Sequence, residues 1–290
     1  MIKKQIALLI LILLTLAGFG QDRTDVSLYL KKKGEQLDSI SSTSGNLFHK
    51  LGHHGPAVEN PWLGFRFYFD KRTSIDIYSK AAPGLELKEH LWYPARKEQM
   101  NGAGADYYKV GKTVGLGGVR LWDGEKLIPL HPVSRRTARV FHRSDSSYME
   151  LYSEGVEYLE QKVNILIRLT VFPDRREARV DAYSLSGQKV QFATSINYFK
   201  DFKIIRKEGY IATWGLHPED VAATPSRISA AIIFSSNTFE KQVDDGKQFL
   251  LISKTGTNIS TWITSSNARE KENSSFEDFI SYLENIDEIQ

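Results

Sequence analysis

The stretch VNILIRLTV, residues 163–171, decides the fold class because its apolar residues recur with a period of two. Every second residue from Val163 to Val171 is Val, Ile or Leu. Successive side chains of an extended strand point to opposite faces, so this spacing makes one face apolar along the whole stretch. The pattern predicts a long β-strand with one face buried in a core.

The same alternation recurs along most of the chain. LGFRFYFD, residues 63–70, has four large apolar residues on one face, and SIDIYSK follows it after the short connection DKRTS, which favours a hairpin. Further alternating stretches are RTARVFHR, VEYLEQKVNILIRLTVF, EARVDAYSL, VQFATSINYF, YIATW, RISAAIIF, KQFLLIS and ISTWIT. About a dozen strands joined by short turns predict an all-β fold, a large antiparallel β-sandwich.

Two segments depart from this period. TDVSLYLKKKGEQLDSI, residues 24–40, predicts a short helix with Thr24 or Asp25 as its N-cap. SSFEDFISYLENIDEI near the end of the chain predicts a C-terminal amphipathic helix packed on the sandwich, with Ser275 and Asp278 as a capping-box-like start. Its apolar face holds Phe276, Phe279, Ile280, Leu283 and Ile286.

Residues 1–20 have the pattern of a secretory signal peptide. Two lysines precede an apolar run from Ile6 to Leu14, and small residues follow it. The run is too short to span a membrane, which takes ~20 apolar residues. We therefore expect a periplasmic or secreted protein with no membrane association after the signal is removed. No fixed repeat or linker divides residues 21–290, so we expect one β-sandwich catalytic domain.

Charge and cysteine content exclude several classes of protein. Removing the two lysines of the leader lowers the formal net charge from +3 to +1, which leaves no global basic field for a nucleic-acid partner. The chain has no cysteine, so neither disulfides nor a lipid-anchored cysteine contribute, and an apolar core has to supply the stability.

His53 and His54 are the first candidates for chemistry, in GHHGPAVENPW. Adjacent histidines rarely chelate one metal ion well, and no HxH or HxxxH spacing supports them. A single ligand from this pair, completed by a distant histidine, stays open, so the presence of a metal is unknown; the distant candidates are His90, His131, His142 and His217. We expect no cofactor. The alternatives for the pair are proton transfer and an exposed loop with no function.

The polar faces of the hairpin carry more information. Arg66 and Tyr68 share one face of the first strand, and Asp76, Tyr78 and Lys80 share one face of the second. Such a face is solvated in many antiparallel sheets. Together with Trp62 and the histidine loop, however, this set is typical of a carbohydrate-binding surface, where aromatic rings stack on sugars and arginine binds carboxylate or sulfate.

Two further stretches are candidates for substrate contacts. In RRTARVFHR, Arg135, Arg139 and Arg143 alternate with Arg136 and His142, which indicates either a solvated face or a local field for an anionic substrate. The stretch TWGLHPEDVAATP places Trp214 and His217 in a loop between strands, where functional residues often lie.

The ordered set of motifs resembles a family. HHGPAVEN, GFRFYFDKRTSIDIYSK, WYP, GAGADYYKVGKTVGLGGVRLWDG and PVSRR are similar to a domain-of-unknown-function family of secreted bacterial proteins from polysaccharide-utilisation gene clusters. The similarity covers most of the chain after the leader. The resemblance implies a role in the breakdown of uronic-acid-rich polysaccharides, and an oligosaccharide dehydratase acting on ulvan is a similar protein.

The resemblance implies a carbon–oxygen lyase that eliminates water from the terminal uronic acid of anionic, sulfated oligosaccharides. Abstraction of the C5 proton requires neutralisation of the adjacent carboxylate, for which Arg66, Arg135 or Arg136 are candidates. We assign the base to His54, with His53 as its near equal, and the acid to Tyr78. Lys80 is expected to lower the pKa of Tyr78 by proximity.

The remaining expectations concern substrate contacts and alternatives. The residues expected to bind the oligosaccharide are Glu59, Arg66, Tyr68, Asp76, Tyr93 of the WYP motif, Arg136, Trp214 and His217. A glycoside hydrolase would instead need a carboxylate pair, Glu59 with Asp76 or Asp220, at glycosidase separation. A non-catalytic sugar-binding module is the third alternative.

Overall fold

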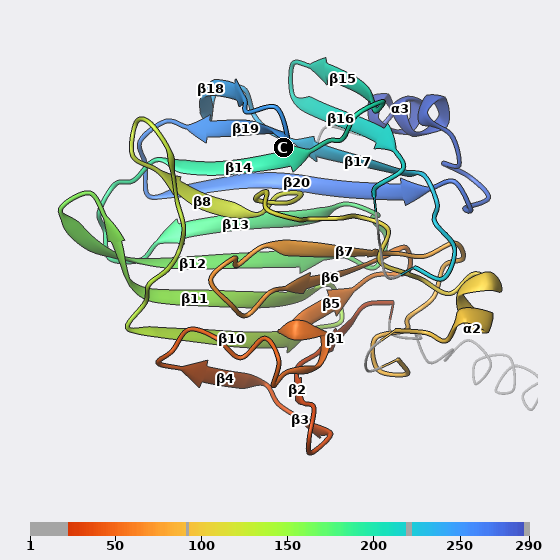
Figure 1. Cartoon of the computed structure of the whole chain (residues 1–290), viewed down its shortest axis with the longest axis horizontal. Coiled ribbons are helices and arrows are strands. Elements are labelled where there is room, and N and C mark those ends of the chain that lie inside the picture. The colour runs from red at the N-terminus through yellow and green to blue at the C-terminus, as the bar shows by residue number, and fades with distance from the viewer. Residues whose placement is uncertain (1–22, 91–92, 219–221, 287–290) are drawn as a thin grey trace, which may run out of the picture.

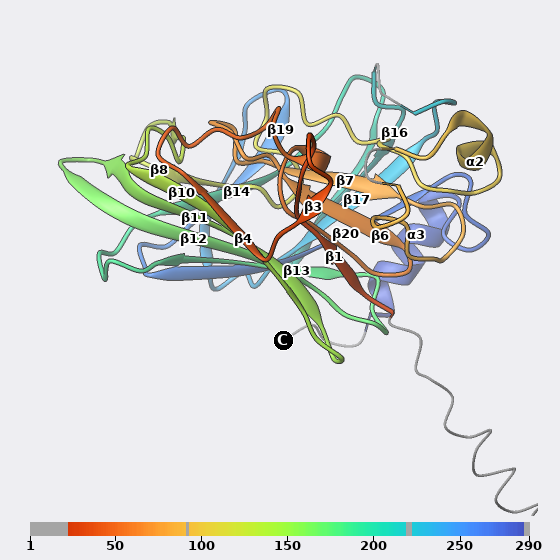
Figure 2. The ribbon, with the colours of Figure 1, turned by 90° about the horizontal axis from the view of Figure 1, so that it is seen from below.

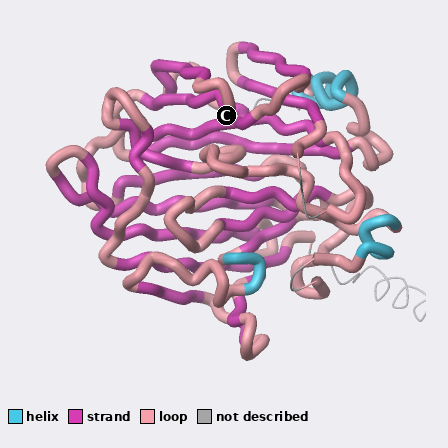
Figure 3. Tube along the Cα trace, viewed as in Figure 1, coloured by secondary structure: helices cyan, strands magenta, loops and turns pink. Residues whose placement is uncertain are grey.

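The computed structural model describes residues 23–90, 93–218 and 222–286. Strands and the loops that join them make up nearly all of these residues (Figure 3). The helical segments of this part are η1 (Gly52–His54), α2 (Arg96–Met100) and α3 (Phe276–Glu284). None of the described helices is long and apolar enough to cross a membrane. The predicted signal peptide lies outside the described residues.

One layer of the molecule is a nine-stranded antiparallel sheet in the order β15-β16-β17-β20-β13-β12-β11-β10-β4 (Figure 1). Its strands are β4 (Ser39–Ser42), β10 (Arg135–His142), β11 (Ser147–Tyr158), β12 (Gln161–Val171), β13 (Ala178–Ser184), β15 (Lys203–Lys207), β16 (Tyr210–Gly215), β17 (Ile228–Ile233) and β20 (Asn258–Asn267). The stretch that predicted the fold lies within β12, between β11 and β13, near the middle of this sheet.

The second layer consists of two smaller sheets in front of the large one (Figure 1). The five-stranded sheet contains β8 (Val119–Trp122), β9 (Leu127–Ile128), β14 (Phe192–Asn197), β18 (Phe239–Asp244) and β19 (Gln248–Ser253). The four-stranded sheet contains β1 (Asp25–Ser27), β5 (Ala57–Glu59), β6 (Leu63–Phe67) and β7 (Ile75–Ser79). In the view from below, this sheet lies over one face of the large sheet (Figure 2). A separate pair is formed by β2 (Tyr29–Leu30) and β3 (Glu35–Gln36).

The main core lies between the two layers. Val163, Ile165, Ile167, Leu169 and Val171 are all fully buried there, and the inward side chains of β6 and β7 join the same apolar cluster. Burying apolar surface is the main favourable term in folding, at ~25 cal/mol per Å². The all-β, antiparallel fold predicted from the alternation is therefore confirmed.

The C-terminal helix is also confirmed, whereas the N-terminal helix is wrong. The Ser275 side chain accepts a hydrogen bond from the Asp278 backbone N–H at the start of α3, and Phe276, Phe279 and Leu283 are buried. Residues 24–40 instead form β1, β2, β3 and part of β4, with Gly34 in the left-handed region at a turn. Pairing of β1 with β5 and of β4 with β10 supplies hydrogen bonds from distant strands, which outweigh local helix propensity.

Candidate active site

The β6–β7 hairpin places the predicted polar residues side by side. The register pairs Arg66 with Asp76 and Gly64 with Tyr78. A Cβ at Gly64 would lie 3.4 Å from the Tyr78 Cβ, which is an ordinary van der Waals contact. This face is not solvated, since Arg66 and Asp76 are each 1% exposed. The segment after β7, residues 81–106, supplies several of the side chains that contact it.

Arg66 is the centre of a buried charged cluster. Its Nη2 donates to carboxylate oxygens of Asp76 and, at 3.0 Å, of Asp106, and its Nη1 donates to the Tyr93 hydroxyl at 3.0 Å. Burial works to lower the pKa of Arg66, but Asp76, Tyr93 and Asp106 outweigh it and raise the pKa well above its usual value. Arg66 is 1% exposed and both of its Nη groups are engaged, so a substrate carboxylate could not reach it, which weakens its case as the group that neutralises that carboxylate.

Lys80 and Glu59 form a second buried pair on the same side. The Lys80 Nζ donates to Glu59 Oε2 at 2.5 Å and to the carbonyls of Asn60 and Gly84 at 2.8 and 2.5 Å. The other carboxylate oxygen of Glu59 accepts the backbone N–H groups of Glu86 and Leu87, both at 2.8 Å. All three ammonium protons are used, so the pair fastens residues 84–87 to β5.

Tyr78 donates its hydroxyl proton to Glu86 Oε2 at 2.7 Å. Burial, and then the charge of Glu86, raise the pKa of Tyr78, and Lys80 is not among the causes. The expectation that Lys80 lowers the pKa of Tyr78 is therefore wrong, because the ammonium group is turned toward Glu59. The phenol stays protonated, with its proton directed at Glu86.

His53 and His54 both adopt left-handed backbone conformations, with φ of 51° and 64°. Such conformations are strained for residues other than glycine, and they persist where the surroundings impose them. The His53 ring is 1% exposed, so it is not an exposed loop residue. Its Nε2 lies 3.3 Å from the Leu87 carbonyl, which can only accept, so Nε2 carries the proton. Burial and the nearby Arg66 lower the pKa of His53 to about 3.

His54 is half-buried and stands at the edge of the cluster. Its Nδ1 donates to the Phe48 carbonyl at 3.3 Å, which leaves the lone pair on Nε2. The Phe48 ring stacks on the imidazole with 3.7 Å between ring centroids. Burial lowers the pKa of His54 to about 4, so the ring is neutral at pH 7.

Tyr68 lies beside His54. Its ring meets the imidazole edge-on at 5.9 Å, and the Arg72 guanidinium lies over it, 4.4 Å from the ring centroid. Burial, and then the charge of Asp76, raise the pKa of Tyr68, so its hydroxyl keeps its proton. A neutral acceptor, a neutral donor and a guanidinium thus occupy one half-buried corner.

Three other candidates lie in different surroundings. Arg136 is fully buried and donates to the backbone carbonyls of Gly45, Asp70 and Leu130. The prediction that Trp214 lies in a loop is wrong, because this residue stands on β16 and packs against α3 in a buried apolar cluster.

His217 accepts the Lys109 N–H at 3.0 Å and lies among Tyr108, Phe199 and Phe202. Its pKa is lowered by burial to about 3. The structure therefore gives Arg136, Trp214 and His217 supporting contacts and does not join them to the Arg66 cluster.

Sequence reasoning missed four members of the site: Phe48, Arg72, Glu86 and Asp106. Asp106 stands in the GAGADYY motif and Arg72 in the hairpin turn, so both lay inside quoted stretches. Phe48 and Glu86 carried no periodic or spacing signal. Among the described residues, no group of three or more His, Asp or Glu side chains is placed to hold a metal ion.

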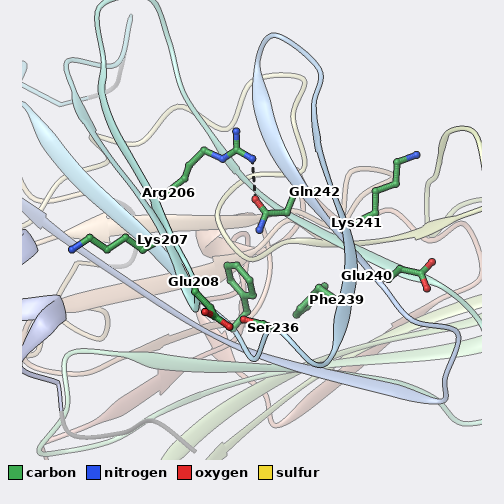
Figure 4. Close-up of a pocket in the computed structure, with 9 residues that line it drawn as sticks. Arg206, Lys207, Glu208, Ser236, Phe239, Glu240, Lys241 and Gln242 are labelled. Carbon is green, nitrogen blue, oxygen red and sulfur yellow. Dashed lines mark hydrogen bonds between the residues drawn. The ribbon is translucent and has the colours of Figure 1, made fainter.

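A pocket of about 510 Å³ lies elsewhere, between the β15–β16 turn and β18 (Figure 4). Arg206 and Gln242 face each other across it and share a hydrogen bond of 3.0 Å. None of the side chains predicted to act on a substrate lines this pocket.

Residues 14–290 match the model of one protein family, described as Domain of unknown function (DUF4861). The chain belongs to this DUF4861 family. The match covers far more than half of the sequence and includes every motif quoted above. A search of curated proteins returned no match.

Two solved structures are distant likenesses of this DUF4861 chain. A mutant of heparan sulfate lyase HepC from Pedobacter heparinus has 8% identity and a TM-score of 0.38 over 73% of this chain. A 4-alpha-glucanotransferase from Thermococcus litoralis has 9% identity and a TM-score of 0.37, also over 73%. The aligned part spans 34% and 39% of those chains. Likenesses this weak assign no activity to the chain.

Proposed function

We propose that this protein is a carbohydrate-active dehydratase. It eliminates water from the terminal uronic acid of anionic, sulfated oligosaccharides of the ulvan type and leaves an unsaturated uronate. The observation that carries the proposal is the pairing of a neutral imidazole, His54, with a protonated phenol, Tyr68, beside the Arg72 guanidinium. The signal peptide predicted from the sequence supports action in the periplasm or outside the cell.

His54 is the proposed base. Its Nδ1–H is held by the Phe48 carbonyl, so Nε2 is the nitrogen that takes the C5 proton. A pKa of about 4 keeps the ring unprotonated at pH 7, and a bound carboxylate nearby would raise that pKa toward the operating pH. His53 is more deeply buried and bonded to Leu87, so we give it the role of positioning the loop.

Tyr68 is the proposed acid, in place of Tyr78. Both phenols are hydrogen-bonded to a carboxylate, Tyr78 to Glu86 and Tyr68 to Asp76. Tyr78, however, is 3% exposed, whereas Tyr68 is half-buried and next to His54. Elimination from a uronic acid needs a proton donor for the departing 4-hydroxyl, and a phenol with a raised pKa supplies it without ionising first.

Arg72 is the proposed partner of the substrate carboxylate. Its side chain is 38% exposed and bonded to Asp70, and its guanidinium lies over the Phe48 and Tyr68 rings. A guanidinium here stabilises the enolate-like charge that develops when C5 loses its proton. Arg66, enclosed by Asp76 and Asp106, supports the site through Tyr93 and the hairpin.

The hydrolase alternative has less support. Its proposed carboxylates, Glu59 and Asp76, are both buried and bound to Lys80 and Arg66. Asp220 lies outside the described residues. A general acid and base for hydrolysis need access to a water and to the glycosidic oxygen, which these two side chains lack.

One experiment separates the three alternatives. The purified protein is incubated with uronate-terminated oligosaccharides, and the products are followed by mass and ultraviolet absorbance. Loss of one water with new absorbance from the unsaturated ring supports the dehydratase. Chain shortening with gain of water supports a hydrolase. Binding without turnover across a substrate panel rejects both enzymes and leaves the sugar-binding module.

A further inference from the structure

A groove of about 620 Å³ lies next to the proposed catalytic corner. Its walls come from two segments that also carry site residues. Leu47 and His49 flank Phe48 in the chain, and Asp70 and Lys71 follow closely after Tyr68. The groove is lined by Ser44, Asn46, Leu47, His49, Lys50, Asp70, Lys71 and His131.

The groove carries uncompensated positive charge. Lys50 and Lys71 are exposed, and neither forms an ion pair within the part of the chain that the structure describes. The only carboxylate in the lining, Asp70, accepts two hydrogen bonds from the Arg72 guanidinium at 2.8 and 2.6 Å. Since Arg72 balances Asp70, the two ammonium groups dominate the local field.

A buried arginine fixes the walls of this groove. The guanidinium of Arg136 donates to the carbonyl of Gly45 at 2.7 Å, to that of Asp70 at 2.6 Å, and to that of Leu130. Each of these residues belongs to the lining or is adjacent to it. Three separate chain segments are thus tied to one rigid group, so the groove exists before a ligand arrives.

Gly45 adds a steric reason for this shape. It has φ of +65°, and a Cβ at this position would lie 2.6 Å from the Val133 side chain and 3.4 Å from Arg136. Only glycine fits this close approach without strain. The walls of the groove therefore depend on both Gly45 and Arg136.

We propose that this groove binds a sulfate or carboxylate on the sugar next to the reacting uronic acid, through Lys50 and Lys71. The inference rests on the proposed function of the neighbouring corner, and it makes the groove the part that selects anionic chains. Ammonium groups bind such oxyanions by charge-assisted hydrogen bonds, and the preformed walls lower the entropy lost on binding.

The test measures binding by calorimetry, with a disaccharide of two uronic acids that carries a sulfate on the second sugar, and its desulfated counterpart, as probes. We compare the wild type, the Lys50→Gln/Lys71→Gln double variant and the control Lys254→Gln, which changes an exposed lysine outside the groove. Loss of two charge-assisted contacts should weaken binding of the sulfated probe about tenfold or more. The control should bind like the wild type.

The two probes identify the anion. If sulfate is bound, the desulfated probe binds the wild type weakly, and the double variant adds no further loss. If a carboxylate is bound, the double variant weakens both probes alike. Equal affinity of the wild type and the double variant for both probes overturns the inference.

Failure of the groove and failure of the dehydratase are distinguishable. If the wild type binds the sulfated probe without turning it over, and the double variant no longer binds it, the groove is supported and the elimination is rejected. If the wild type eliminates water, and the double variant has the same affinity and KM, the dehydratase proposal is supported and the groove is rejected. The exposed lysines leave folding intact, which circular dichroism checks.

Discussion

Arg66 and Asp76 lie directly opposite each other on β6 and β7, and their side chains form an ion pair in which each is 1% exposed. Arg66 also forms an ion pair with Asp106, which comes from the segment after the hairpin. Burying such a pair is costly, and the contacts of the whole cluster have to offset the desolvation of each charge. The pair therefore links the hairpin to the segment that covers it.

Removing one member of this pair should destabilise the fold strongly. Arg66→Met leaves the buried carboxylates of Asp76 and Asp106 without their cation, and we expect it to lower the free energy of unfolding by about 3–5 kcal/mol. Asp76→Asn should cost less, because Asp106 still pairs with Arg66. Urea unfolding measures the change. The double variant Arg66→Met/Asp76→Leu should recover part of the loss. Single variants with the stability of the wild type would contradict a buried, coupled pair.

Replacing His54 by Ala should remove turnover with the fold intact. A positioned general base contributes roughly 10²–10⁴-fold to the rate, and we expect kcat to fall by that factor. The rate is read from the absorbance of the unsaturated product, and added imidazole should restore part of it. His142→Ala, at an exposed position on β10, is the matched control. Full activity of the His54→Ala variant would reject the role.

The two tyrosines of the hairpin offer a direct comparison. Tyr68→Phe removes the proposed proton donor, and kcat should fall about 10²-fold or more with little change in KM. Tyr78→Phe removes a hydrogen bond to Glu86, which still accepts the Gly104 N–H, so turnover should persist. The reverse result, with activity lost only in Tyr78→Phe, would return the acid role to Tyr78.

Stability should fall when the pH is lowered below about 6.5. His53 and His217 have pKa values of about 3 in the fold, against about 6.5 in the unfolded chain. Between these values the unfolded state binds more protons, so the free energy of unfolding decreases as the pH falls.

By linkage, each of the two histidines should lower the free energy of unfolding by about 2 kcal/mol between pH 7 and pH 5. Urea unfolding at pH 5, 6 and 7 tests this. His217→Gln should flatten the dependence on pH, whatever it does to stability at pH 7. A variant with the pH slope of the wild type would show that His217 does not titrate in this way.

The C-terminal helix should contribute to global stability. Phe279 is fully buried in the cluster that includes Ala212, Trp214 and Ala231, so Phe279→Ala should cost roughly 3–5 kcal/mol. Chemical denaturation measures the loss. Ser281→Ala, on the solvent side of α3, should leave the unfolding midpoint unchanged. A comparable loss in both variants would mean that the apolar face of α3 is not what anchors it.

The family resemblance read from the motifs places the chain in a group of unknown function, and the match over residues 14–290 agrees with it. The motifs also held Arg66, Asp76, Tyr78 and Lys80, which the hairpin register brings to one face. The motifs did not predict which side chains would contact these residues. Glu86 and Asp106 reach that face through an irregular segment, whose path depends on contacts that have no sequence period.

The sequence by itself determined the strand alternation, the hairpin and the C-terminal helix, because each rests on local spacing of apolar residues with a cap or a short turn. Only the tertiary structure decided that residues 24–40 form strands, since distant strands supply their partners. It also decided that Arg66 and Lys80 are enclosed by carboxylates, and that His54, Phe48, Tyr68 and Arg72 meet at one half-buried corner. Burial and pairing set charge and pKa, and both arise from contacts between residues far apart in the chain.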